Sequence, residues 1–215
     1  MIILLLGPPG AGKGTQGERI AAALKIPKLA TGDVLRAAVR DGTAQGRAAK
    51  AYMDRGDLVP DEVILGIMKE ALAAPSAASG VVLDGVVRTV PQADGLARVL
   101  ADLGRRLDVV LVFDVDEEEL VRRLGARTVC EGCQTPYMGR DPGSACAKCG
   151  GRLVRRADDE PEAVRNRMRT YRAQTAPVLE WYAARAKSGG PRVVRIEAAG
   201  EVAAIERRVL EALGR

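Results

Sequence analysis

The sequence contains no histidine and very few aromatic residues, with one Phe and one Trp among 215 residues. The lack of histidine excludes the usual general base and the triads built around it. Any chemistry must therefore rest on carboxylates, lysine, arginine, backbone amides or a metal ion. Apolar residues make up 47% of the chain, so a substantial core is possible, but Ala, Val, Leu and Ile have to build it.

Long hydrophobic runs are also absent. No stretch approaches the roughly 18 apolar residues that a membrane-spanning helix requires. The apolar start at residues 2–6 lacks a basic flank, is short for a signal peptide and ends in a glycine turn. We therefore expect no membrane association and a cytoplasmic location.

The charge excess is small, because 33 Lys and Arg face 28 Asp and Glu, for a net charge of +5. An excess of this size is consistent either with a solubilising surface or with an anionic ligand. The planar fork of arginine suits phosphate oxygens, which favours the second reading for some of these residues.

Apolar runs and helical patterns alternate along most of the chain. The expected strands are 2–6, 80–84, 107–115 and 192–196. The expected helices are 13–24, 61–73, 91–103, 116–125, 161–187 and 201–213. This alternation predicts an α/β fold with a parallel sheet flanked by helices. Residues 31–60 and 127–159 break the alternation and resemble insertions.

The segment "GPPGAGKGT" at residues 7–15 lies between an expected strand and an expected helix. Gly7, Gly10, Gly12 and Gly14 are expected to let the backbone curl, so that its amides form an anion-binding nest at a helix N-terminus. Lys13 can reach the β- and γ-phosphates of a nucleotide. The alternative is a tight turn without a ligand, against which four glycines and a lysine after an apolar strand argue.

All the cysteines of the chain lie in one short segment, as two Cys-x-x-Cys pairs: Cys130, Cys133, Cys146 and Cys149. This spacing favours tetrahedral Zn²⁺, with two disulfides or unliganded thiols as alternatives. Four protein ligands leave no open position, so the predicted ion is structural. A segment of 33 residues cannot stabilise itself by apolar burial alone, which gives the ion a purpose.

A zinc ribbon in a basic protein could instead bind nucleic acid. Tyr137, Arg140 and Lys148 would supply that surface, but Glu131 and Asp141 dilute its charge. We therefore favour a protein that does not bind nucleic acid.

Further blocks accompany the glycine-rich loop in a fixed order: "TGDVLR" (31–36), "LDGVVRTVPQAD" (83–94), "RRLGAR" (122–127) and "RRADDEPEAVRNR" (155–167). Together they resemble the adenylate kinase family, in its long-lid, zinc-binding form, over nearly the whole chain. The resemblance implies reversible phosphoryl transfer from MgATP to AMP, giving two ADP, by a monomer. The alternative is a kinase for another nucleoside monophosphate.

The resemblance also implies a division of the chain. Residues 1–30, 61–126 and 160–215 would form the P-loop core, residues 31–60 a helical AMP-binding insertion, and residues 127–159 the zinc-binding lid. The lid would exclude water from the phosphates and would have to open again in each turnover.

Individual site residues follow from the same resemblance. The ATP-binding residues would be Gly10, Ala11, Gly12, Lys13, Gly14, Thr15, Arg123 and Arg127. The AMP-binding residues would be Thr31, Arg36, Gly85, Arg88, Gln92, Arg156 and Arg167, with Thr31 and Gln92 at the base. The catalytic residues around the transferring phosphates would be Lys13, Arg88, Arg123, Arg156 and Arg167. Asp33 and Asp84 would orient water on Mg²⁺.

Two further expectations concern local geometry. Arg123 and Arg127 would share one helical face if the helix that ends near residue 125 extended past it. Val86 and Val87 stand where the family usually has Phe-Pro, and we expect a trans peptide bond there because a cis bond without proline costs about 3–4 kcal/mol.

Overall fold

The structure is a computed structural model, which describes the backbone of residues 1–215 and all side chains in that range other than that of Gln45. In these described residues a five-stranded sheet has the order β2-β3-β1-β4-β8, and every pairing is parallel. The strands are β1 (Ile2–Leu6), β2 (Lys28–Ala30), β3 (Val81–Asp84), β4 (Val109–Asp114) and β8 (Arg192–Glu197). The predicted α/β class is confirmed.

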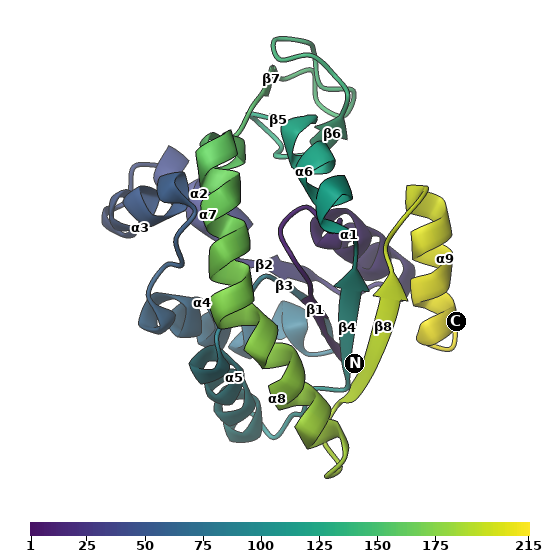
Figure 1. Ribbon diagram of the computed structural model, residues 1–215. Helices are drawn as coiled ribbons and strands as arrows, with labels where there is room; N and C mark the ends of the chain where they lie inside the picture. Colours follow the sequence, from purple (N-terminus) through teal and green to yellow (C-terminus); the bar gives the residue numbers. More distant parts are fainter.

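The central strand β1 is buried on both faces, as its continuous apolar sequence predicts. Side chains alternate along a strand, so Ile2, Leu4 and Leu6 enter one apolar cluster, while Ile3 and Leu5 enter the other. The first cluster includes side chains from α4 (Asp61–Ala73), α5 (Val90–Asp102) and α8 (Ala176–Ala186). The second includes side chains from α1 (Lys13–Leu24) and α9 (Val202–Ala212). Helices therefore cover both faces of the sheet (Figure 1).

The segment after β2 is helical, as expected, and contains α2 (Thr31–Arg40) and α3 (Ala44–Arg55). The side chain of Thr43 caps α3 by accepting a 3.0 Å hydrogen bond from the Gly46 amide. Gly56 then ends α3 in a left-handed conformation (φ 76°). The sequence reading missed β2, because this edge strand has only three residues and one of them is buried.

The segment that contains the cysteines forms a second sheet at the top of the molecule in Figure 1, away from the main sheet. Its antiparallel order is β6-β5-β7, from β5 (Arg127–Cys130), β6 (Pro136–Met138) and β7 (Leu153–Val154). These short strands lack an apolar period, so the sequence did not predict them. Helix α6 (Glu117–Gly125) leads into this sheet.

Residues 161–187 form one long rod across the front of Figure 1, as predicted, but the rod is not a single α-helix. A π-helical segment (Tyr171–Thr175) joins α7 (Pro161–Thr170) to α8. Shorter 3₁₀ turns lie at Pro75–Ala77 and Ala157–Asp159.

Two local expectations have clear outcomes. Among the described residues there is no cis peptide bond, so the bond between Val86 and Val87 is trans, as expected. Both valines are buried in the larger apolar cluster. Helix α6 ends at Gly125 and Arg127 begins strand β5, so the condition under which Arg123 and Arg127 would share a helical face is not met. In the part of the chain that the structure describes, no helix has the length and apolarity to cross a membrane.

Candidate active site

The glycine-rich loop connects β1 to α1 and contains backbone conformations that favour glycine. Gly10 and Gly12 have φ angles of 85° and 86°. A side chain at Gly7 (φ 144°) would place its Cβ 2.8 Å from the Phe113 carbonyl oxygen. Gly14 differs from our expectation, because it lies within α1, where a Cβ would make an ordinary contact with Asp84 Oδ2 at 3.4 Å. The backbone amides of the loop and the positively polarised N-terminus of α1 thus lie together, where they can bind an anion.

The Lys13 ammonium lies inside this loop. Its Nζ donates hydrogen bonds to the carbonyl oxygens of Gly7 (2.7 Å) and Pro8 (2.8 Å). Burial lowers the pKa of Lys13 to about 8; Asp84 opposes this shift, while Arg88 adds to it. An anionic ligand would favour the charged form of this lysine.

A cleft of about 610 Å³ opens above the loop and is lined by every residue that the sequence assigned to nucleotide binding. The lining includes a group of cations from several elements: Lys13, Arg36, Arg88, Arg123, Arg127, Arg156 and Arg167. Burial, and then neighbouring arginines, lower the pKa of Arg156 to about 10 and also lower that of Arg88. Among the described side chains, the buried Nε atoms of Arg36 and Arg156 have no hydrogen-bond partner. Acidic side chains pair with four of these cations, but Lys13, Arg88 and Arg156 have no ion pair among the described residues, and an oxyanion would balance their charge.

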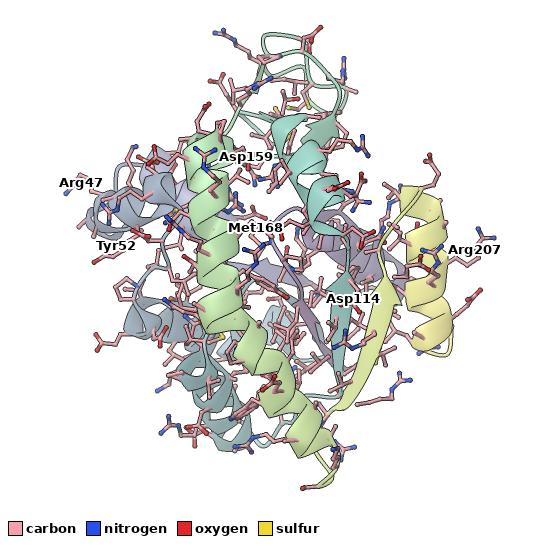
Figure 2. All side chains as sticks on the ribbon, viewed as in Figure 1. Arg47, Tyr52, Asp114, Asp159, Met168 and Arg207 are labelled. Atoms are coloured by element: carbon pink, nitrogen blue, oxygen red, sulfur yellow. The ribbon has the colours of Figure 1, made fainter. Side chains whose placement is uncertain are left out.

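Acidic residues at the base of the lid hold two of these arginines. Arg127 Nε donates to Asp159 Oδ2 at 2.7 Å, and Arg167 Nη1 contacts Asp158 Oδ2 at 3.1 Å and Asp159 Oδ1 at 3.0 Å. Figure 2 labels Asp159 at the end of α7 nearest the lid. The Asp158 pKa is lowered, because the attraction of Arg167 and other arginines outweighs the effect of burial. These pairs orient the lid arginines toward the cleft.

Arg123 has partners that the sequence reading missed. Its Nε donates to Glu119 Oε1 at 2.7 Å, and its Nη2 donates to the Ala198 carbonyl at 2.9 Å. Hydrogen bonds from Arg122, and then from Arg123, lower the pKa of Glu119 to about 2. The i,i+4 spacing of Glu119 and Arg123 on α6 was the signal that could have revealed the pair.

Two polar side chains that the sequence assigned to AMP binding, Thr31 and Gln92, already have partners in the protein. Thr31 Oγ1 donates to the Gly85 carbonyl at 2.8 Å. Gln92 is 1% exposed; its Oε1 accepts from the Arg88 amide and its Nε2 donates to Asp61 Oδ1, both at 2.7 Å. The sequence reading did not identify Asp61, which lies 31 positions from Gln92 in the chain.

Two carboxylates lie near the loop, and they differ in whether a cationic side chain already pairs with them. Asp84 ends β3 beside Gly14, where the substrate phosphates would meet the loop. Asp33 already pairs with Arg36 and lies 3.7 Å from the Lys28 ammonium. The effect of Arg36 outweighs burial and lowers the pKa of Asp33. Asp84, with the Thr15 hydroxyl in the same cleft, provides the oxygen ligands and water partners that Mg²⁺ prefers.

The four cysteines are free thiols whose sulfur atoms lie within 4.8 Å of one another. The Sγ distances are 3.4 Å for Cys130–Cys149 and 3.6 Å for Cys133–Cys146, close to the roughly 3.8 Å edge of a tetrahedral Zn–S₄ site with 2.3 Å bonds. A Cβ at Gly151 would lie 3.0 Å from Cys130 Sγ, so glycine leaves room for the cluster. The cysteines fit Zn²⁺, and the separations exclude S–S bonds.

Geometry of this kind defines a class of protein, because a single cleft with a phosphate loop on one wall and buried arginines on the others is suited to aligning two phosphate chains. The chain is a P-loop phosphotransferase. Comparison with known proteins narrows the class: the adenylate kinase family model matches residues 5–187.

Relatives match almost end to end. An adenylate kinase of Gemmatimonas aurantiaca is 65% identical over 215 residues, covering 99% of both chains. Adenylate kinases of Salinispora tropica and Methanothrix thermoacetophila are 44% and 45% identical, covering 99% and 94% of this chain and 98% and 93% of their own. The chain belongs to the adenylate kinase family. It is a nucleoside monophosphate kinase that transfers a phosphoryl group reversibly from MgATP to AMP, giving two ADP.

Proposed function

We propose that the residues lining the cleft divide this reaction as follows. The ATP phosphates lie on the loop amides of residues 10–15, with Lys13, Arg123 and Arg127 around them. The AMP phosphate lies between Arg36 and Arg88, and Arg156 and Arg167 bridge the two phosphate chains. One observation carries this assignment: all these groups line a single cleft, and two of its buried arginine nitrogens have no hydrogen-bond partner among the described side chains.

The mechanism requires alignment and charge neutralisation. The arginines hold the acceptor phosphate in line with the γ-phosphate, and their fixed positive charges stabilise the negative charge on the transferring group. Thr15, Asp84 and Asp33 would hold the water shell of Mg²⁺, which supplies further charge neutralisation when bound. No side chain has to act as a strong base, which agrees with the absence of histidine.

The proposal includes a division into parts. Residues 1–30, 61–126 and 160–215 form the core, residues 31–60 bind AMP, and residues 127–159 form a lid. The lid closes over ATP and excludes water, which would otherwise accept the phosphoryl group. A structural Zn²⁺ on Cys130, Cys133, Cys146 and Cys149 stabilises the lid. The enzyme acts as a cytoplasmic monomer that binds neither nucleic acid nor membrane.

A coupled assay with ATP and each of AMP, CMP, UMP and GMP tests the function, with metal content measured in parallel. We expect AMP to be the preferred acceptor and one zinc per chain. Equal rates with AMP, CMP and UMP would contradict the assignment of Thr31 and Gln92 to the base. A structure with a bisubstrate analogue whose polyphosphate avoids Lys13 and Arg88 would contradict the assignment of the phosphates.

A further inference from the structure

The side-chain amide of Gln92 is held at both ends by groups that can make only one kind of hydrogen bond. The Arg88 amide is a donor, and it lies 2.7 Å from Gln92 Oε1. The Asp61 carboxylate is an acceptor, and its Oδ1 lies 2.7 Å from Gln92 Nε2. If the amide were flipped, its NH2 group would face the Arg88 N–H donor and its oxygen would face the Asp61 carboxylate, so neither hydrogen bond could form.

Thr89 fixes the direction of the same network. Its Oγ1 accepts from the Gln92 backbone amide at 3.2 Å, as the N-cap of α5. The hydroxyl hydrogen is then free to be donated to Asp61 Oδ2, 3.1 Å away. The carboxylate of Asp61, in the first turn of α4, therefore receives hydrogen bonds from two side chains of the α5 N-terminus. Helices α4 and α5 pack side by side (Figure 1).

The orientation of the amide matters because Gln92 is buried yet lines the cleft. After its two bonds to the protein, the amide retains one N–H donor on the Asp61 side and one oxygen lone pair on the Arg88 side. The purine edge of adenine has the matching order, with an acceptor at N1 and a donor at N6. Hypoxanthine has the reverse, with a donor at N1 and an acceptor at O6, so it would need the amide to flip.

We propose that Asp61 is a specificity-determining positioning residue, which locks the Gln92 amide in the orientation that accepts a 6-amino purine monophosphate and rejects a 6-oxo one. This inference rests on the proposed place of Gln92 at the acceptor base. Asp61 acts only through Gln92. Its replacement by Asn leaves size unchanged but supplies a group that can donate as well as accept, which removes one of the two clashes that the flipped amide would meet. The clash with the Arg88 amide remains, so the flipped orientation becomes less costly and not free.

The test compares kcat/KM for AMP and for IMP, with ATP saturating, in the wild type, Asp61→Asn and Glu62→Gln. Glu62 is the exposed neighbour of Asp61 in the first turn of α4, so its variant controls for charge near that helix N-terminus. We expect the IMP-to-AMP ratio to rise about tenfold in Asp61→Asn and to stay unchanged in Glu62→Gln. The ratio is measured on one preparation, so partial unfolding of a variant cancels.

A double-mutant cycle with Gln92→Ala completes the test. Because Asp61 acts through Gln92, Asp61→Asn should leave the ratio unchanged in the Gln92→Ala background. An unchanged ratio in the single variant, or an equal rise in both backgrounds, would overturn the inference. Failure of the underlying assignment is distinguishable, because it appears in the wild type itself as equal use of AMP, CMP and UMP.

Discussion

The cleft and the lid use charge in opposite ways. In the cleft, Lys13, Arg88 and Arg156 are buried close to other cations, and burial lowers the pKa of each. In the lid, four sulfur atoms converge within 4.8 Å, where a cation can bind them. Burying these cations costs the nucleotide-free protein stability, and they would gain anionic partners if the nucleotides bind as proposed. The lid groups, with a metal ion bound, would stabilise the folded chain itself.

The two regions also differ in what holds them together. The main sheet is buried between large apolar clusters that include Leu4, Met68 and Phe113. The apolar cluster of the lid has as its buried members only Cys130, Cys146 and Leu153, counted over the described residues. A segment so poor in apolar burial needs another source of stability, which a metal ion can supply. The difference indicates how a segment without a large core could be stable once a metal ion binds its four cysteines.

The largest expected effect comes from removing a cleft cation. Arg88→Met should lower kcat about 10³-fold, or about 4 kcal/mol in barrier height, because it removes the guanidinium that we propose contacts the acceptor phosphate. The thermal midpoint of the nucleotide-free enzyme should stay the same or rise, because one of several repelling cations is gone. Coupled kinetics and a thermal scan measure the two quantities. A fall in both would mean that Arg88 holds the fold together.

A matched pair of leucines tests the difference in packing. Leu4 in β1 and Leu153 in β7 are both 0% exposed. Leu4→Ala should lower the unfolding free energy of the core by about 2–5 kcal/mol, since it leaves a cavity in the centre of the sheet. Leu153→Ala should leave the core transition, followed by the fluorescence of Trp181 in α8, nearly unchanged. Equal losses by that probe would show that lid and core unfold as one unit.

Much of this fold could be predicted because its signals are local. The strand at residues 2–6, the loop around Lys13 and the two cysteine pairs each require only a short stretch of sequence. The strands β2 and β5–β7 were missed because they have two to four residues and depend on pairing for their existence. The π-helical segment within 161–187 likewise has no sequence signal that we recognised.

In the candidate site, too, features with a local sequence signal could be predicted and features that depend on distant contacts could not. The arginines, and the acidic residues Asp158 and Asp159 that pair with two of them, could be assigned because they stand in ordered blocks, whereas contacts between distant parts of the chain could not. Asp61 meets Gln92 across 31 positions, and Asn166 reaches Asp57, which lines the cleft, across 109. Gly14 was credited with conformational freedom, but in the fold it lies within helix α1, beside Asp84. Contacts between distant segments are set by packing, which no local pattern encodes.

Removing a cysteine of the metal site should give a smaller effect than Arg88→Met. It should change thermal stability and leave kcat nearly the same, whereas Arg88→Met should change kcat and leave stability nearly the same. Cys146→Ser should lower the thermal midpoint by roughly 5 °C, corresponding to about 2 kcal/mol for a chain of this size, while kcat at low temperature changes little. A chelator should lower the midpoint of the wild type and have no effect on the variant. Metal analysis supplies the control. A wild-type midpoint that is insensitive to chelation would contradict the structural role of the ion.

The smallest expected effect is the pH dependence that Lys13 contributes. Burial holds its pKa at about 8 in the folded protein, below the ordinary value of 10.5. Below pH 8 both states carry the charge, and the folded state bears the full cost of burying it. Between pH 8 and 10.5 the unfolded state binds more protons, so this contribution makes stability rise with pH, by on the order of 1 kcal/mol from pH 8 to 9.

Lys13→Met should therefore flatten the curve of unfolding free energy against pH in this window. Saturating ATP should flatten it in the wild type too, because the phosphates keep Lys13 charged. Identical curves for the nucleotide-free wild type and variant would show that burial of the charged Lys13 ammonium does not destabilise the folded protein.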